Sequence, residues 1–242
     1  MTVTSTSPGA VDPLLPERYQ GRWREPFEEP IYARLERGVS VLDIGSGRHP
    51  AVPLERRPED VEYVGLDLSR DELAAAGPAA YTEAVAADAT ILQPALVDRF
   101  DLVVSWQVLE HVRDLRQTVD NIRTYLRPGG TFVALFSGTW SAFGVVNKVL
   151  PHSVGKRIVE PIMNRKERNT PVFPAYYDKC YASALEDIFV PWNESTIHPL
   201  YVGATYFSFA RPLMRAYLAY ENTIASRGVA NLATHYLVTA KR

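Results

Sequence analysis

Short apolar runs recur through the first 140 residues, and most of them end at a glycine or an aspartate. They occupy residues 39–44, 61–66, 84–87, 100–105 and 131–136. Runs of this length with little charge are typical of strands that are buried on both faces of a sheet. We therefore predict five consecutive strands, with the third weaker than the others.

The segments between these runs favour helices. After the fourth run, apolar residues recur at spacings of three and four, which places them on one helical face. They are Val108, Val112, Leu115, Val119, Ile122 and Leu126, and Pro128-Gly129-Gly130 is predicted to end this helix. Alternating strands and helices predict an α/β fold with a doubly wound, mostly parallel sheet.

The pattern changes after Phe136. Residues 137–190 are rich in aromatic side chains and do not form a simple strand–helix unit. From 145 to 181 the chain carries seven cations and three anions, a local charge of +4. Residues 205–224 favour a helix that Pro212 interrupts, and residues 234–240 read as a closing strand.

These patterns predict one domain over residues 17–242, preceded by a disordered lead-in over residues 1–16. Its parts are a core at about 37–136, a lid insertion at about 137–190, and a C-terminal helix and strand at about 191–242. The lead-in lacks the basic and apolar regions of a signal peptide, so we expect a cytoplasmic protein.

The composition of the chain disfavours several classes of binding partner. The net charge of −2 and the pI of about 6.2 disfavour a protein held to nucleic-acid phosphates. A single cysteine, Cys180, excludes a disulfide framework and a multi-cysteine zinc site. The uncharged stretch 128–147 is too polar to predict a membrane span.

The first strand leads into a glycine turn at Gly45–Gly47, which lets a ligand approach the backbone closely. A dinucleotide-binding turn would have a third glycine where this chain has Pro50. Asp43 lies inside the strand just before the turn. A carboxylate there favours a ligand that carries an ammonium group over a pyrophosphate.

Two further acids end strands. Asp67 follows the second strand, where it suits the two hydroxyls of a ribose, and Asp88 follows the third, where it suits an adenine amino group. Together with Leu109-Glu110-His111-Val112 and Leu126-Arg127-Pro128-Gly129-Gly130, this ordered set resembles the class I (Rossmann-like) S-adenosylmethionine-dependent methyltransferases. It is most similar to their ubiquinone-biosynthesis-type branch. The resemblance covers about residues 39–136 and the closing strand.

The resemblance implies a seven-stranded sheet with an antiparallel C-terminal strand, a lid formed by the insertion, and S-adenosylmethionine as cofactor. It also implies that the cofactor contacts Asp43, Gly45, Ser46, Gly47, Asp67, Leu68, Asp88, Ala89, Ser105, Trp106 and Gln107. Asp43 would reach the amino group through water. For Asp43 or Asp67 taken singly a turn or cap role is an alternative, and for Trp106 a plain core role.

Methyl transfer to a hydroxyl benefits from a general base, and His111 is the candidate. Local packing of His111 is the competing interpretation, and His49, His152 and His198 are alternative bases. Tyr176, Tyr177 and Tyr206 are candidate substrate contacts, although aromatic residues of this kind also build the core of a lid. No carboxylate cluster suggests a metal, so none is predicted.

The sequence therefore predicts methyl transfer to a small-molecule acceptor, at a hydroxyl oxygen, by a monomer or homodimer without nucleic-acid or membrane partners. One alternative is a cofactor-binding module that has lost catalysis. A nicotinamide-dependent oxidoreductase is a further alternative, and Pro50 and Asp43 argue against it.

Overall fold

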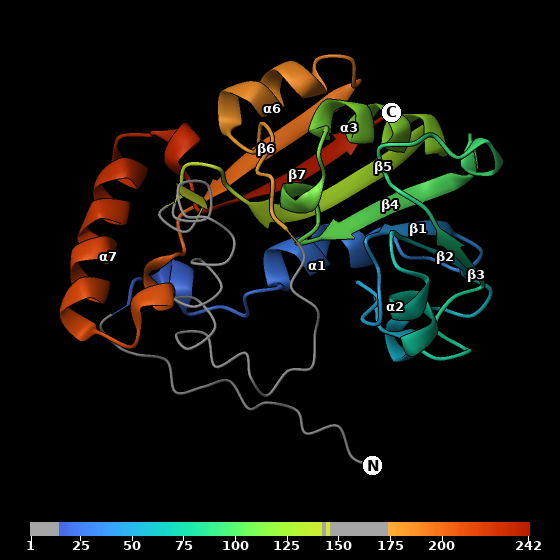
Figure 1. Cartoon of the computed structure of the whole chain (residues 1–242), viewed down its shortest axis with the longest axis horizontal. Helices are drawn as coiled ribbons and strands as arrows, with labels where there is room; N and C mark the ends of the chain where they lie inside the picture. Colours follow the sequence, from blue (N-terminus) through green and yellow to red (C-terminus); the bar gives the residue numbers. More distant parts are fainter. Residues whose placement is uncertain (1–14, 142–143, 146–173) are drawn as a thin grey trace, which may run out of the picture.

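The chain folds around one seven-stranded sheet. The computed structural model describes residues 15–141, 144–145 and 174–242. The strand order is β3-β2-β1-β4-β5-β7-β6, and β7 lies antiparallel between β5 and β6 (Figure 1). The bounds are β1 Ser40–Ile44, β2 Glu62–Asp67, β3 Glu83–Ala86, β4 Phe100–Trp106, β5 Leu126–Ser137, β6 Glu194–Leu200 and β7 His235–Lys241.

The predicted fold class is confirmed. The five strands expected from the apolar runs pair in parallel from β3 through β5, and the closing strand is antiparallel. Strand β6 was not predicted, because its sequence Glu-Ser-Thr-Ile-His-Pro-Leu is mostly polar, contains a proline and lacks the continuous apolar run of the other strands. Pairing with β7 rather than burial defines that strand.

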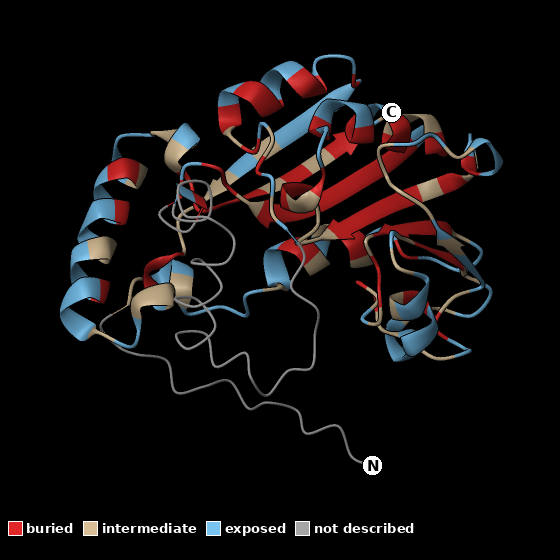
Figure 2. Ribbon diagram, viewed as in Figure 1, coloured by how far each residue is buried: buried red, intermediate tan, exposed pale blue. Residues whose placement is uncertain are grey.

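The central strands β1 and β4 are buried on both faces, whereas the edge strands β3 and β6 are mostly exposed (Figure 2). All five residues of β1 are buried, as expected of a central strand. On one face, β-strand side chains pack with helix α3 (Leu115–Tyr125) and helix α6 (Ala182–Phe189). On the other face, they pack with Phe27 and Ile31 of helix α1 (Glu25–Tyr32).

The remaining helices are short or lie toward the ends of the sheet. They are α2 Arg70–Ala75, α7 Arg211–Ser226 and the 3-10 turns η1 Glu17–Tyr19, η2 Leu54–Arg56, η3 Pro94–Leu96, η4 Leu109–His111, η6 Ala204–Phe207 and η7 Ala230–Leu232. Pro212 lies in the first turn of α7, so the regular helix begins next to that proline.

The helix predicted over 108–126 is shorter than its apolar stripe. It begins at Leu115, because the Asp114 side chain caps it by accepting a hydrogen bond from the Gln117 backbone N–H at 3.0 Å. His111 therefore lies in the 3-10 turn η4, not on the helix that the spacing predicted. The helix also ends earlier, at Tyr125, and Gly129 adopts a φ of 83° inside β5.

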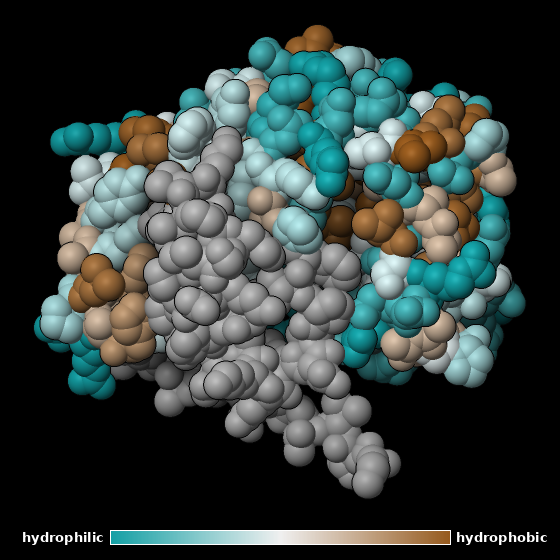
Figure 3. Space-filling view, viewed as in Figure 1, coloured by the Kyte–Doolittle hydropathy of each residue, from teal (hydrophilic) through white to brown (hydrophobic). Residues whose placement is uncertain are grey.

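The predicted insertion divides into two parts. Most of it, including His152 and all of the basic segment except residues 145 and 174–181, lies outside the described residues. Its last part is helix α6, whose Leu185 and Ile188 are fully buried in the core beside β5 and β7. On the face shown in Figure 3, apolar side chains gather over η6 and α7, where Phe209 and Leu213 are exposed.

The N-terminal segment is tied to the C-terminal half. The Tyr19 hydroxyl donates to the Glu221 carboxylate of α7 and accepts from the Ala204 backbone N–H at 2.9 Å. Glu221 is buried and also accepts from the Gly203 N–H at 2.7 Å. This network holds α7 and η6 against the start of the described chain.

Candidate active site

A cavity of about 590 Å³ opens at the carboxyl edge of the sheet, where β1 and β4 diverge into different loops. Ligands of doubly wound sheets bind at such a point, and the volume is in the range of small-molecule sites. Nine of the eleven residues predicted to contact the cofactor line this cavity, namely Gly45, Ser46, Gly47, Asp67, Leu68, Asp88, Ala89, Trp106 and Gln107. Tertiary structure therefore brings together residues as far apart in the sequence as Gly45 and Gln107.

The glycine turn forms one wall. Gly45 has a φ of 72°, and a Cβ atom there would lie 2.3 Å from Cγ2 of Val108. Gly47 also has a positive φ, of 46°. The turn follows β1 because the Gly45 N–H donates to the Leu66 carbonyl oxygen at 2.6 Å. Only glycine suits the first of these positions, since a side chain would collide with the loop after β4.

Asp67 ends β2 at the cavity wall. Its Oδ1 accepts a hydrogen bond from the Ser69 N–H at 2.8 Å. Burial raises the pKa of the Asp67 carboxyl, although this hydrogen bond acts to lower it. Beside it, Arg48 and Glu72 form a two-pronged ion pair with both contacts at 2.6 Å. The pair fastens the glycine turn to α2, and it neutralises a second carboxylate close to Asp67.

Asp88 and Ala89 lie at the far end of the same cavity. The Asp88 Oδ1 atom accepts from the Thr90 N–H and hydroxyl at 2.9 and 2.8 Å. Asn121 of α3 donates to the Ala89 carbonyl oxygen at 2.9 Å. These bonds fix the loop after β3, so its polar edge faces the cavity in one conformation.

Asp43 is placed differently from the other predicted residues. It is buried beneath the glycine turn and does not line the cavity. Its Oδ2 accepts from the Ala51 N–H and the Tyr63 hydroxyl, both at 2.7 Å. Burial raises the pKa of Asp43 to about 6, opposed by these two hydrogen bonds and by Arg57, which lies over the Tyr63 ring. Ser105 is also buried away from the cavity, and its hydroxyl donates to the Ile44 carbonyl oxygen at 3.3 Å.

Trp106 joins the N-terminal segment to the cavity. The centroid of its ring lies 4.9 Å from that of Phe27 and 6.1 Å from that of Trp23. The Cζ atom of Arg24 lies 4.4 Å from the Trp106 ring centroid. These contacts favour a fixed ring at the cavity wall, held by residues that precede the first strand. Trp106 therefore packs against the core and also lines the cavity.

His111 faces the same cavity from η4. Its Nδ1 lies 2.9 Å from the Pro174 carbonyl oxygen. A carbonyl oxygen can only accept, so this contact places the proton on Nδ1 and leaves the Nε2 lone pair free. Tyr176, two residues after Pro174, also lines the cavity, and the Arg113 guanidinium lies 5.0 Å above its ring.

The segment 174–181, here named the strap, lies against the loop 109–115. The Glu110 carbonyl oxygen accepts from the N–H groups of Tyr176 and Tyr177 at 2.9 and 3.0 Å. The Glu110 side chain is buried. Its Oε1 accepts from the Ser137 N–H at 3.2 Å, and burial raises the pKa of its carboxyl. The strap thus positions His111 and Tyr176 together.

The other two predicted tyrosines do not line the cavity. Tyr177 is buried, with a φ of 50°, and its carbonyl oxygen accepts from the Thr139 hydroxyl at 3.0 Å. The Tyr206 hydroxyl lies 3.2 Å from Nε2 of the buried His235. His235 contacts Trp23, which in turn contacts Trp106 of the cavity wall, so Tyr206 is connected to that wall only through these rings.

Sequence reasoning did not predict several wall residues, including Arg48, Glu72, Val108, Val112, Arg113 and Pro174. Arg48 adjoins the glycine turn, so proximity in sequence was an available signal. His49, named as an alternative base, lines the cavity as well. Pro174 is distant in sequence from every other wall residue except Tyr176, and only the folded chain shows its place.

Comparison with known proteins agrees with this geometry. A family model described as a methyltransferase domain matches residues 16–142, more than half of the chain. The chain belongs to this methyltransferase-domain family. The match agrees with the resemblance of its sequence motifs to the class I S-adenosylmethionine-dependent methyltransferases.

Two curated relatives are similar over part of their length, and both are named ubiquinone biosynthesis O-methyltransferase. The protein from Nitrobacter winogradskyi is 30% identical over 113 residues, 45% of this chain and 42% of the relative. The protein from Paramagnetospirillum magneticum is 33% identical over 100 residues, 40% of this chain and 39% of the relative. The chain thus matches less than half of the length of each.

Solved structures share the fold. A phosphoethanolamine N-methyltransferase 2 from Haemonchus contortus in complex with S-adenosyl-L-methionine matches with a TM-score of 0.55 at 16% identity, over 92% of this chain and 53% of that one. A putative methyltransferase from Haloferax volcanii, in complex with the activator Trm112, matches with a TM-score of 0.52 at 18% identity, over 90% and 91% of the two chains.

No group of three or more His, Cys, Asp or Glu side chains among residues 15–141, 144–145 and 174–242 is placed to hold a metal ion. Within the same part of the chain, no helix is long and apolar enough to span a membrane.

Proposed function

We propose that the chain binds S-adenosylmethionine in this cavity and transfers the methyl group to a hydroxyl oxygen of a small-molecule acceptor. The observation that carries the proposal is the convergence of nine predicted cofactor residues on one cavity in a chain of the methyltransferase-domain family. Bound there, S-adenosylmethionine supplies a methyl group already activated by its positively charged sulfur.

The wall residues fit the parts of that molecule. Asp67 offers carboxylate oxygen to the ribose hydroxyls, Leu68 is exposed beside it for the adenine face, and the Asp88–Ala89 edge suits the adenine amino group. The glycine turn admits the methionine portion close to the backbone. Asp43 is buried and does not line the cavity, so its carboxylate would reach the amino group only through a bridging water.

His111 is the proposed general base. The Pro174 carbonyl oxygen holds the proton on Nδ1, so Nε2 can accept the proton of an acceptor hydroxyl. As the oxygen–methyl bond forms, the sulfur–methyl bond breaks. The hydroxyl proton passes to Nε2, and S-adenosylhomocysteine leaves as the neutral thioether. The reaction requires the acceptor oxygen to lie in line with the methyl group, an arrangement that the cavity walls would have to impose.

Titration calorimetry with S-adenosylhomocysteine tests the cofactor assignment. The Asp67→Asn variant is expected to bind it about tenfold or more weakly, because hydrogen bonds from the ribose to a charged acceptor are lost. Asp71→Asn, an exposed change of the same kind on α2, is expected to leave the affinity unchanged. Equal affinities in the two variants, or tight binding of NAD with no binding of S-adenosylhomocysteine, would overturn the proposal.

A further inference from the structure

Gln107 adopts a backbone conformation that is uncommon for its residue type. It follows β4 with a φ of 56°, in the left-handed region that favours glycine. Its backbone N–H donates to the Leu135 carbonyl oxygen at 2.7 Å, which holds the residue at the end of the strand. Gln107 lines the cavity together with Trp106 and His111.

The orientation of the Gln107 amide is set by Ser137, the last residue of β5. The Ser137 hydroxyl donates to the amide Oε1 at 3.2 Å. The amide Nε2 is buried, yet it has no hydrogen-bond partner among the described residues. A buried N–H group without a partner is rare in folded proteins, and it marks a place that a ligand or a water completes. The network therefore presents a donor, not an acceptor, at this point.

Resting on the proposed function, we propose that Gln107 determines specificity by donating from Nε2 to the reacting atom of the acceptor, and so selects oxygen over nitrogen nucleophiles. A hydroxyl oxygen has two lone pairs and one proton. One lone pair attacks the methyl group, the second accepts from Nε2 of Gln107, and the proton faces Nε2 of His111. All three directions are then satisfied.

A neutral amine cannot satisfy the same site. Its nitrogen has one lone pair, which must point at the methyl group, and its remaining valences carry hydrogen or carbon. The Gln107 N–H would then meet an N–H and stay without a partner. A site built to hydrogen-bond a hydroxyl rejects an analogue that leaves a buried group unpaired. The expected acceptor is therefore an alcohol or phenol, and the aromatic wall at Trp106 favours a planar one.

A matched pair of probes tests this selection without knowledge of the natural acceptor. 4-Methylphenol and 4-methylaniline have nearly the same shape and are both neutral at pH 8. Their dissociation constants are measured by calorimetry on the protein saturated with S-adenosylhomocysteine. The wild-type protein is expected to bind the phenol about tenfold more tightly than the amine.

Three variants separate the donor from other roles of the residue. Gln107→Leu is expected to bring the two constants close together, and Gln107→Glu, which offers an acceptor, to favour the amine. Ser137→Ala releases the amide and is expected to reduce the preference. Gln20→Glu, a change at an exposed position, is the control and should retain the wild-type preference.

The outcomes distinguish this inference from the proposed function. Failure to bind S-adenosylhomocysteine would overturn the proposed function itself. If S-adenosylhomocysteine binds normally, three results would overturn only the role of Gln107. They are a wild-type preference for the amine, an unchanged preference in both Gln107 variants, and no binding of the phenol up to its solubility limit.

Discussion

The His111 imidazole keeps its Nδ1 in a hydrogen bond to the Pro174 carbonyl oxygen, 2.9 Å away. The two residues are 63 positions apart, and the bond decides which ring nitrogen can act as a base. The motif around His111 identified the residue as a candidate. The tautomer that makes it useful comes from the strap, which the motif does not contain.

If His111 is the base, removing its imidazole slows the chemical step and leaves cofactor binding intact. His111→Ala is expected to lower methyl transfer from labelled S-adenosylmethionine to 4-methylphenol by about 10²-fold. The affinity for S-adenosylhomocysteine, measured by calorimetry, should stay within about twofold of wild type. Unchanged methyl transfer in a folded variant would remove His111 from the mechanism.

Two adjacent tyrosines of the strap, identical in side-chain type, occupy different environments. Tyr176 and Tyr177 are both aromatic and both were predicted to meet substrate, yet only Tyr176 lines the cavity. The positive φ of Tyr177 and the hydrogen bond from Thr139 to its carbonyl oxygen hold that residue in a buried position. Side-chain type cannot distinguish the two, because backbone conformation decides which one faces the cavity.

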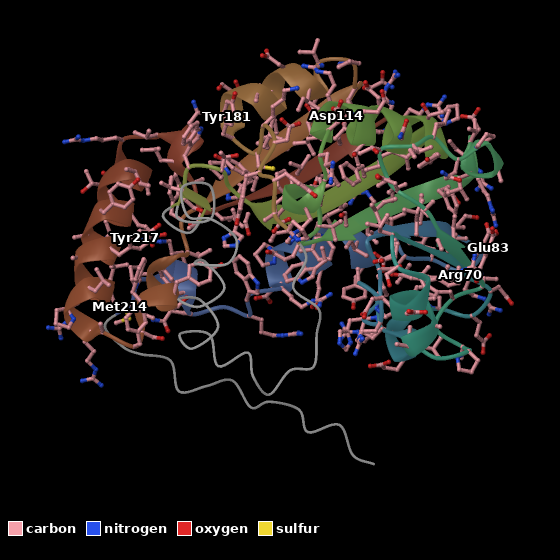
Figure 4. The ribbon with its side chains drawn as sticks, viewed as in Figure 1. Arg70, Glu83, Asp114, Tyr181, Met214 and Tyr217 are labelled. Atoms are coloured by element: carbon pink, nitrogen blue, oxygen red, sulfur yellow. The ribbon has the colours of Figure 1, made fainter. Side chains whose placement is uncertain are left out.

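At the scale of elements, α3 begins between two carboxylates from different parts of the chain. Asp114, at the start of the helix (Figure 4), accepts from the Gln117 N–H at 3.0 Å. Asp178 of the strap accepts from the Leu115 N–H, also at 3.0 Å. First-turn N–H groups of a helix have no partners within the helix, so both bonds stabilise it. The second also fastens the strap beside His111.

The Asp178→Ala variant tests this attachment. Loss of the bond to Leu115 is expected to lower the free energy of unfolding by about 1 kcal/mol, measured from urea denaturation. Amide hydrogen exchange at Tyr176 and Tyr177 should accelerate, because the strap loses one of its anchors. Asp187→Ala, at an exposed position of α6, is the control. Equal exchange in both variants would show that Asp178 does not fasten the strap.

At the scale of the whole molecule, two buried groups give stability opposite pH dependences. Burial raises the pKa of Asp43 to about 6, so its folded form holds a proton more tightly than the unfolded chain. Its effect on stability becomes less favourable as pH rises from about 4 to 6. Burial lowers the pKa of His235 to about 3, so stability falls as pH drops below about 6.5. Between about pH 4 and 6 the two contributions oppose one another.

Asp43→Asn removes one of these contributions while keeping an oxygen that can accept from Ala51 and Tyr63. The variant is expected to be more stable than wild type at pH 7, by roughly 2–3 kcal/mol, because no charge remains to be buried. At pH 4 and below the difference should vanish, since wild-type Asp43 is then protonated. Urea denaturation at the two pH values measures it. A difference independent of pH would contradict the assignment.

The sequence by itself determined the five strands from β1 to β5 in their order along the chain, and the residues at their carboxyl ends. These features are local: an apolar run defines a buried strand, and the turn or acid that ends it lies at the sheet edge. That is why Gly45, Asp67 and Asp88 were predicted and line the cavity. The same locality explains the misplacement of His111, since a helical stripe does not show where a cap begins the helix.

Only the tertiary structure decided which loops meet and which atoms are left to a ligand. Asp43 bonds inward to Tyr63, the strap brings Pro174 and Tyr176 to His111, and Ser137 turns the Gln107 amide. Each of these pairs joins residues 20 to 63 positions apart. Their contacts depend on the register of the sheet and on the path of the returning chain, which no local pattern contains.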